Sequence, residues 1–224
     1  VKTSCKIDTG LFQKYGVKNV ASIGVNDDYG KDGETAFCSE IERLGGTVCE
    51  REYMTQSDTT ILNQLNKLLA KSPDCIYIVV RDTALGVSVK QMREHGYKGL
   101  IVGVNAFDSP LVWAAAGTAG EGCIFTSAYV DLTAPKAQKF VDAYKIANGE
   151  EPDWIAAYGY SIGEYLVECA AKANGDKAVL CSLLASVKVD SIRGELEMNP
   201  SRDVISPIGI FIREGDKNKL IEIR

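Results

Sequence analysis

The residues VASIGVNDDYG, numbered 20 to 30, open the segment that decides the fold of this chain. An apolar strand is followed by an acidic loop and an amphipathic helix, then by Gly45-Gly46 and a second strand that reaches Met54. Such a parallel β-α-β unit sets its first loop at the carboxyl end of the strand, where open α/β sheets bind small molecules. The loop offers an aromatic ring beside two carboxylates and no glycine-rich phosphate cradle. It therefore favours a small-molecule binder over a nucleotide enzyme.

Helix and strand signals alternate through the first 126 residues. The pattern predicts strands at 20–25, 47–53, 75–80, 100–104 and 123–126, with helices at 31–44, 83–95 and 111–116. Ser57 or Asp58 is expected to cap a further helix, whose buried stripe runs from Ile61 to Leu69. The regular alternation predicts the fold class α/β, with a parallel sheet, right-handed crossovers and flanking helices.

The pattern changes after residue 126. Residues 135–147, 154–173 and 177–186 are typical of three helices with little strand between them, and two apolar runs at 208–212 and 220–223 predict a closing hairpin. Three amphipathic helices need a sheet, or one another, to bury their apolar stripes. The sequence therefore indicates an incomplete second lobe whose sheet is supplied elsewhere.

The composition excludes several classes of protein. The 224 residues are 46% hydrophobic and 25% charged, which is ordinary for a globular protein. A net charge of −5 with interspersed signs argues against a nucleic-acid partner. No apolar run approaches the roughly 20 residues of a membrane span, and no signal sequence is present in this chain.

Metal, cofactor and enzyme chemistry are not expected. The seven cysteines form no C-x-x-C pair and the chain has one histidine, His95, so the spacing does not support a zinc site. Cys38 and Cys49 could bridge neighbouring elements, but reduced, buried thiols are favoured. The chain has no G-x-S-x-G or G-x-G-x-x-G motif after a strand, and an acidic phosphoacceptor pocket would need a lysine that is missing.

Several short motifs occur in the same order as in one family. They are Asn26-Asp27-Asp28-Tyr29-Gly30, Leu44-Gly45-Gly46, Pro73-Asp74, Gly96-Tyr97-Lys98, Ala119-Gly120-Glu121-Gly122, Ala157-Tyr158-Gly159-Tyr160 and Ile192-Arg193-Gly194 before Glu197-Met198-Asn199. The set spans about 17–212 and resembles the periplasmic-binding-protein type I family, specifically the branched-chain amino-acid (Leu/Ile/Val) substrate-binding proteins of ABC importers.

The resemblance implies an architecture and a function. Residues 1–126 and 205–224 would form the second ligand-binding lobe, and 127–204 the C-terminal helical part of the first lobe. The family binds an amino acid or a related polar solute in the cleft between its lobes and presents it to a membrane permease outside the cytoplasm. Most of the first lobe has no counterpart here, so it would be removed, built by another chain, or exchanged with a second copy in a dimer. A receptor or regulator domain that senses a ligand through the same fold is the alternative.

Three positions after predicted strands carry the expected binding site of the second lobe. The resemblance matches Tyr29 to a ring that covers the ligand, while Asp27 and Asp28 are expected to cap the following helix rather than touch the ligand. Arg81 and Asp82 follow a strand directly. Arg81 could grip a ligand carboxylate, pair with Asp82 or stay solvated.

The remaining candidates are Asn105, Phe107 and Tyr158. Asn105 aligns with the position where relatives specific for aliphatic amino acids place an acid against the ligand's ammonium. The amide keeps hydrogen bonding but drops the charge, which leaves room for an amide, a urea or another polar solute. Asn105 could equally be a plain turn residue. Phe107 is either core or cleft wall, and Tyr158 either touches ligand or packs its helix.

Overall fold

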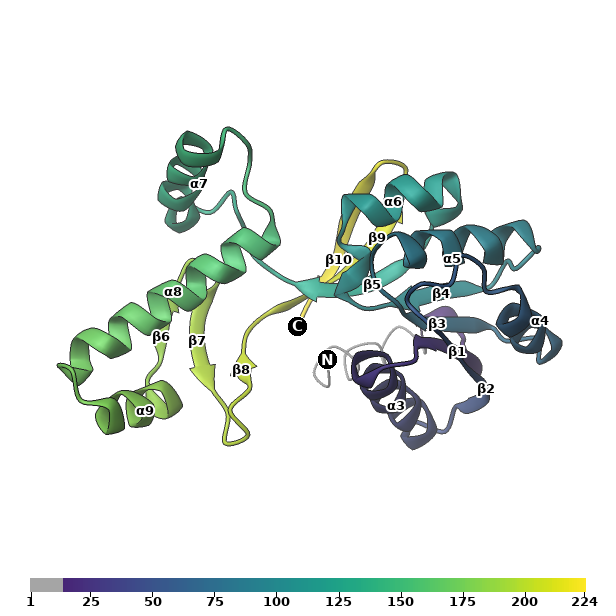
Figure 1. The fold of residues 1–224 in the computed structure, drawn as a ribbon, viewed down its shortest axis with the longest axis horizontal. Helices are drawn as coiled ribbons and strands as arrows, with labels where there is room; N and C mark the ends of the chain where they lie inside the picture. The colour runs from purple at the N-terminus through teal and green to yellow at the C-terminus, as the bar shows by residue number, and fades with distance from the viewer. Residues whose placement is uncertain (1–13) are drawn as a thin grey trace. The chain divides into compact units, whose positions relative to one another are not determined.

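The computed structural model describes residues 14–224, which divide into two compact units (Figure 1). Unit 1 holds residues 14–127 together with Gly209–Glu222. Unit 2 holds Ala128–Ile208. Each unit has its own sheet and its own buried clusters, so each is described by itself.

Unit 1 is built on a seven-stranded sheet in the order β10-β9-β5-β4-β3-β1-β2. Its strands are β1 Asn19–Val25, β2 Thr47–Met54, β3 Cys75–Val79, β4 Leu100–Gly103, β5 Ile124–Ala128, β9 Ile208–Glu214 and β10 Lys217–Ile223. The pairs from β2 through β5 are all parallel, which confirms the predicted parallel α/β sheet. The order 2-1-3-4-5 reverses between β1 and β3, and their carboxyl ends are where such sheets bind ligands.

Helices cover both faces of this sheet (Figure 1). They are α3 Asp28–Arg43, α4 Leu62–Ala70, α5 Asp82–Glu94 and α6 Pro110–Ala116, with short turns η1 Asn105–Phe107 and η2 Gly117–Gly120. Alternate residues of β3 pack on opposite faces of the sheet. Ile76 and Ile78 join the large core beneath α4, α5 and α6, whereas Tyr77 stacks on Phe37 of α3 at a centroid distance of 3.6 Å. All five residues of β3 are buried, as expected for a strand covered on both sides.

One predicted helix cap is wrong. The helix α4 begins at Leu62, after Ile61, and has no side-chain cap. Asp58 instead accepts hydrogen bonds from the N–H and Oγ1 of Thr55, at 2.8 and 2.6 Å, and closes a turn of its own. The local turn thus satisfies the carboxylate four residues before the helix starts.

Unit 2 contains the three expected helices, α7 Pro135–Asn148, α8 Trp154–Ala173 and α9 Lys177–Ser186. It also contains a three-stranded antiparallel sheet that sequence reasoning missed, built from β6 Val189–Ser191, β7 Gly194–Met198 and β8 Val204–Ile205. Tyr165, Cys169, Val189 and Leu196 form a small core between α8 and this sheet. No strand lies between the three helices, as predicted, whereas the short strands that follow α9 were not predicted.

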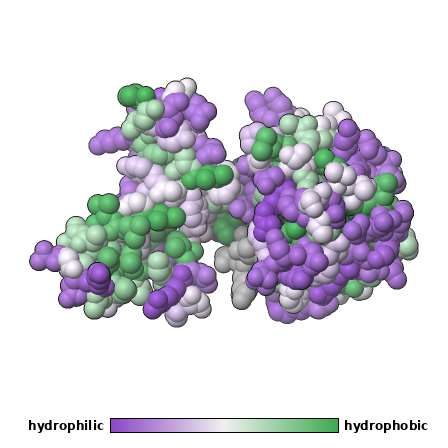
Figure 2. All heavy atoms as spheres, viewed as in Figure 1, coloured by the Kyte–Doolittle hydropathy of each residue, from purple (hydrophilic) through white to green (hydrophobic). Residues whose placement is uncertain are grey.

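A flank of α8 beside its buried side is apolar and exposed. Ile155, Ile162, Leu166 and Val167 keep between 45% and 70% of their surface accessible. Figure 2 shows hydrophobic side chains gathered over this unit. The apolar surface of the helix is therefore wider than the part that it buries within unit 2.

The cysteines of the described residues are free thiols, and neither Cys38 nor Cys49 forms the bridge considered from sequence. Cys38, Cys75, Cys123 and Cys169 are fully buried, as predicted. Within the described part of the chain, no helix is both long and apolar enough to cross a bilayer.

Candidate functional site

The loop after β1 is held tightly at the carboxyl edge of the sheet in unit 1. The Asn26 N–H donates to the Met54 carbonyl at 2.7 Å, which ties the loop to the end of β2. Asp27 caps α3, since its Oδ1 accepts from the Gly30 N–H at 2.9 Å, and this confirms the predicted capping role. A side chain at position 30 would place its Cβ 2.0 Å from the Val25 carbonyl oxygen, so the loop requires glycine there.

Three side chains meet at this edge from two neighbouring strands. Arg81 follows β3, and its Nη1 lies 2.7 Å from Oδ2 of Asp27. Its guanidinium carbon lies 4.0 Å from the centre of the Tyr29 ring, so the cation also stacks on the aromatic face. We call Asp27, Tyr29 and Arg81 the edge cluster. The sequence had left Arg81 to a ligand carboxylate, to Asp82 or to solvent, and the structure pairs it instead with Asp27.

The edge cluster is charged and open to solvent. The hydrogen bond from Arg81, followed by that from the Gly30 N–H, lowers the pKa of Asp27 below its ordinary value of 3.8. Asp27 is therefore a carboxylate at neutral pH. The side chains of Arg81 and Asp27 remain 35% and 44% exposed, so a solute can reach them.

The main chain around Arg81 is also held in place. Gln56, from the segment after β2, donates its Nε2–H to the Arg81 carbonyl at 3.0 Å. The next residue, Asp82, has a φ of +52°, in the left-handed region that non-glycine residues rarely adopt. Such a conformation costs about 1–3 kcal/mol, so the surrounding contacts hold the main chain here. Asp82 is exposed at the start of α5.

Asn105 and Phe107 have different surroundings. Asn105 is exposed at the carboxyl end of β4, the strand next to β3, so it shares the edge with Arg81. Phe107 has no accessible surface and packs in the core, 5.4 Å from the Trp113 ring and 5.7 Å from the Phe125 ring. Of the two alternatives left by the sequence, this burial favours core over cleft wall, and Phe107 supports the edge from beneath.

The last candidate, Tyr158, lies near the start of α8 in unit 2. Its ring centre lies 3.9 Å from the guanidinium carbon of Arg193, in the turn between β6 and β7. Trp154 meets the same ring edge to face at 6.5 Å. Arg193 and Gln56 were not predicted. Arg193 lies in one of the motifs that carry the resemblance, but nothing in that motif or around Gln56 indicates the contact each residue makes, because both contacts join residues distant in sequence.

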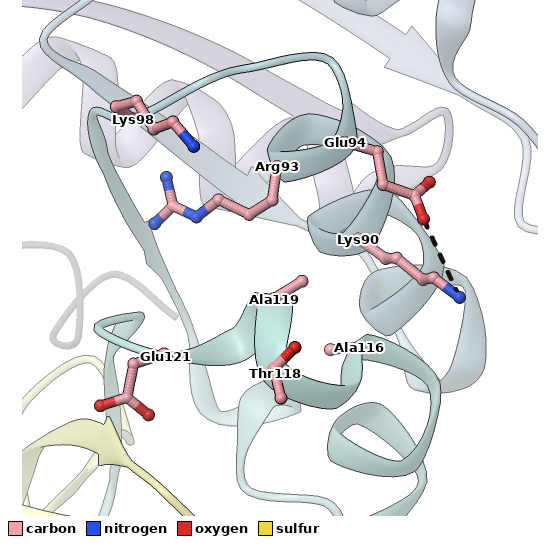
Figure 3. A pocket seen from close by; sticks show the side chains of 8 residues that line it. All are labelled: Lys90, Arg93, Glu94, Lys98, Ala116, Thr118, Ala119 and Glu121. Carbon is pink, nitrogen blue, oxygen red and sulfur yellow. Dashed lines mark ion pairs between the residues drawn. The ribbon is translucent and has the colours of Figure 1, made fainter.

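A separate hollow of about 490 Å³ lies in unit 1 near the end of α5 (Figure 3). Its lining carries mixed charges, from Lys90, Arg93, Glu94, Lys98 and Glu121, with Ala116, Thr118 and Ala119. The Nη1 group of Arg93 is already bonded to the carbonyls of Tyr97 and Gly99, at 3.0 and 2.8 Å. Because Arg81 and Asp82 stand at the other end of α5, this hollow is distinct from the edge cluster.

The described residues hold no group of three or more histidine, cysteine or acidic side chains placed to bind a metal ion. What unit 1 offers at its sheet edge is an aromatic face, a guanidinium and hydrogen-bonding groups. Such an arrangement can bind and orient a small molecule.

Comparison with known proteins gives a consistent result. Residues 8–207 match the family model described as periplasmic binding protein. The chain is 24% identical over 212 residues to Leu/Ile/Val-binding protein homolog 3 of Brucella melitensis, covering 91% of this chain and 56% of that protein. The solved leucine-binding protein LivK of Thermotoga maritima has a TM-score of 0.89 at 23% identity, covering 99% of this chain and 65% of that one.

Two further solved structures share the fold at 21% identity. A solute-binding protein of an ABC transporter from R. palustris, in complex with benzoate, has a TM-score of 0.84 over 99% of this chain and 62% of its own. The substrate-binding protein LivJ of Streptococcus pneumoniae, in complex with isoleucine, has a TM-score of 0.81 over 97% of this chain and 64% of its own.

The chain spans little more than half the length of the Brucella protein and just under two thirds of the length of these structures. These relatives are solute-binding proteins and not enzymes. The match over residues 8–207 shows that the chain belongs to the periplasmic binding protein family.

Proposed function

We propose that this chain acts in an extracytoplasmic solute-binding protein of an ABC importer and binds a small, amino-acid-like or polar organic solute without transforming it. The single observation that carries the proposal is the edge cluster of Asp27, Tyr29 and Arg81. It stands at the carboxyl ends of β1 and β3, where the strand order of the sheet reverses. In this proposal, unit 1 is the second ligand-binding lobe and unit 2 is the C-terminal part of the first lobe.

The edge cluster is pre-organised to bind rather than to react. Asp27 fixes the plane of the Arg81 guanidinium at 2.7 Å, and the Tyr29 ring supports one face of that plane. A solute would meet donors that are already oriented, which reduces the entropy cost of binding. Asn105 and Asp82 supply further hydrogen-bonding groups at the same edge.

We propose that the solute carries a carboxylate and an apolar body. Benzoate and isoleucine, found in two proteins of the same fold, have these two features in common. Arg81 supports a carboxylate by charge, and the aromatic ring of Tyr29 supports an apolar or planar body. Asn105 is uncharged, so it does not supply the carboxylate that would stabilise an ammonium group on the solute.

Isothermal titration calorimetry of the wild type and of Tyr29→Ala and Arg81→Ala tests the proposed site. The probes are L-leucine, L-isoleucine and benzoate. We expect each substitution to weaken the binding of the preferred probe at least tenfold, about 1.4 kcal/mol, while the thermal unfolding of the protein changes little.

Arg43→Ala is the matched control. Arg43 belongs to the same unit, is 64% exposed and pairs with Glu40 at the far end of α3. Its removal should leave affinity unchanged. Unaltered affinity in both Tyr29→Ala and Arg81→Ala would reject the edge cluster as the site.

The permease partner and the extracytoplasmic location are part of the same proposal. The family match supports both, because the related proteins serve ABC transporters. Co-purification of the chain with the products of permease and ATPase genes from the same operon tests the importer role. A regulator or kinase encoded in their place would favour the alternative, a ligand-sensing domain.

A further inference from the structure

The hollow near the end of α5 contains cations that the edge cluster does not use (Figure 3). Lys90 and Arg93 come from the C-terminal half of α5, and Lys98 comes from the turn that follows the helix. Lys90 lies 4.0 Å from Glu94 in an i,i+4 pair. Among the described residues, neither Arg93 nor Lys98 forms an ion pair. Two positive charges of the hollow therefore have no counter-charge in this part of the chain.

The guanidinium of Arg93 is held in a fixed position. The chain turns back after α5 through Gly96, whose φ of +82° lies in the left-handed region that favours glycine. This turn brings the carbonyls of Tyr97 and Gly99 to Nη1 of Arg93, at 3.0 and 2.8 Å. Tyr97 is itself buried, and its hydroxyl donates to the Leu100 carbonyl at 3.1 Å. An anion at the guanidinium would therefore meet a donor that is already oriented.

A second edge of the same guanidinium stays open. Nε and Nη2 of Arg93 donate to no described residue, and neither is among the enclosed polar atoms without a partner. Two parallel N–H groups on one edge of a guanidinium match two oxygens of one anion. Lys98 and Thr118 are exposed, and they add an ammonium and a hydroxyl to the lining of the same hollow. The hollow thus offers an anion donors from three side chains.

A structural role accounts for only part of this cluster. A cation in the last turn of a helix is stabilised by the partial negative charge of the helix terminus, which is sufficient for Arg93 and its bonds to two carbonyls. Lys98 lies beyond the helix, and its ammonium donates to no described residue. Two like charges that line one hollow repel each other, and an anion held between them removes that repulsion.

The two acids in the lining do not neutralise this side of the hollow. Glu94 has its partner one helix turn earlier in α5. Oε2 of Glu121 accepts the Gly215 N–H at 2.7 Å, and Figure 3 shows the carboxylate turned away from Arg93. The part of the hollow at Arg93 and Lys98 therefore keeps a positive charge.

The charge and the size of the hollow indicate the class of ligand. A dianionic oxyanion neutralises both free cations, whereas a single carboxylate neutralises only one. A phosphate group can offer two oxygens to the open edge of Arg93 and still present another to Lys98. The volume of about 490 Å³ lies within the range of small-molecule sites, so a phosphate carried by a small organic body also fits.

We propose that Arg93 and Lys98, together with Thr118, form a second binding site on unit 1 that takes a phosphate group, either as the free ion or on a small organic molecule. The site goes beyond the proposed solute-binding function. It lies within unit 1 alone, at the opposite end of α5 from the edge cluster, and it uses no residue of that cluster.

Calorimetry of the full chain with inorganic phosphate and with glycerol 3-phosphate tests the inference. Sodium chloride keeps the ionic strength constant, because salt screens exposed charges. We expect the wild type to bind at least one probe saturably, and Lys98→Gln to weaken that binding about tenfold. Arg93→Lys keeps the charge but loses the planar fork, so it should also weaken binding. If Arg93→Lys does not fold, Lys98→Gln decides, because that side chain makes no bond that the fold could lose.

Two control variants separate this site from the rest of unit 1. Lys31→Gln removes the same charge as Lys98→Gln from an exposed position on α3, and it should leave phosphate binding unchanged. Arg81→Ala removes the cation of the edge cluster and should also leave phosphate binding unchanged. In turn, Lys98→Gln should bind L-leucine, L-isoleucine or benzoate as the wild type does.

The outcomes separate the two proposals. If the wild type binds neither phosphate probe saturably, or if Lys98→Gln binds as tightly as the wild type, the phosphate site is overturned and the proposed solute function stands. Phosphate binding that is lost in Arg81→Ala and kept in Lys98→Gln also overturns the site, because the anion then binds at the edge cluster. Phosphate binding that depends on Lys98, in a protein that binds none of the solute probes, supports the site and counts against the proposed function alone.

Discussion

In unit 1 the strand β3 buries every residue, whereas in unit 2 the helix α9 buries none of its ten. The same contrast holds for whole cores. Twenty buried residues form one cluster on a single face of the unit 1 sheet, while the two clusters of unit 2 hold five and four. Unit 1 therefore contains both its sheet and the helices that cover it. Unit 2 contains three helices, but its three-stranded sheet is too small to bury their apolar surfaces.

The contrast is clearest in α8. Ala157, Ser161, Tyr165, Cys169 and Ala173, spaced four apart, form its buried side. Ile155, Ile162 and Leu166 form a neighbouring flank of the helix and remain about half exposed. An exposed apolar flank of this kind is a candidate surface for packing against another element, in line with the incomplete lobe expected from the sequence.

The largest expected effect compares one leucine from each unit. Leu65→Ala removes a side chain with no accessible surface from the core of unit 1. We expect the free energy of unfolding to fall by about 2–5 kcal/mol, from lost burial and from the cavity that is left. Leu166→Ala removes the same atoms from the outer side of α8, where 46% of the residue is exposed, and should cost less than about 1 kcal/mol.

Urea unfolding followed by circular dichroism gives both values. Equal losses would break the comparison, because Leu166 would then be buried in solution. Sedimentation of the wild type would show whether the dimer considered from the sequence provides that cover.

The second comparison concerns a buried and an exposed charge. Glu34 on α3 has no accessible surface and is surrounded by partners. Ser22 Oγ and Tyr53 OH donate to it at 2.8 and 3.0 Å, and Nε of Arg51 lies 3.4 Å away. Glu34→Gln should lower the free energy of unfolding by about 2–4 kcal/mol, because an amide cannot accept all of these donors.

Glu42→Gln is the control for charge alone. Glu42 pairs with the same Arg51 at 3.2 Å, but its side chain is 54% exposed. We expect a change of less than about 0.5 kcal/mol in the same urea titration. A similar loss in the two variants would mean that the Arg51 pair, and not burial of Glu34, carries the effect.

The sequence predicted the parts of the fold that long periodic segments determine. The bounds of α8 and α9 agree with the structure, because caps at Asp153 and Asp176 coincide with the start of the apolar pattern. The strands β6 to β8 were missed because they contain two to five residues and are interrupted by turns, too short for an alternation to be recognised.

The candidate site was predictable only in part. A strand followed by a polar loop locates Tyr29, Arg81 and Asn105 at one edge, and the parallel sheet confirms that placement of the strand ends. The pairing of Arg81 with Asp27 joins residues that are 54 positions apart in the sequence, so it cannot be predicted from a local motif. The burial of Arg193 depends likewise on β6 and β7, which were not predicted.

The smallest expected effect is a change in one pKa at the edge cluster. Asp27 has a lowered pKa in the folded protein, so its contribution to stability is present above its ordinary pKa of 3.8 and is lost as the pH falls through the lower, folded value. Arg81→Ala removes the principal cause. We expect the pKa of Asp27 to rise toward 3.8 while remaining below it, since the Gly30 N–H still donates.

Carboxyl carbon NMR across an acid titration measures this shift, with two internal controls. Asp58 in unit 1 and Asp131 in unit 2 also have lowered pKa values, but Thr55 and Thr133 cause them. Neither should move in Arg81→Ala. An unchanged pKa of Asp27 would mean that the guanidinium of Arg81 does not rest on this carboxylate in solution, and the edge cluster would then present Arg81 to the solute without a paired carboxylate.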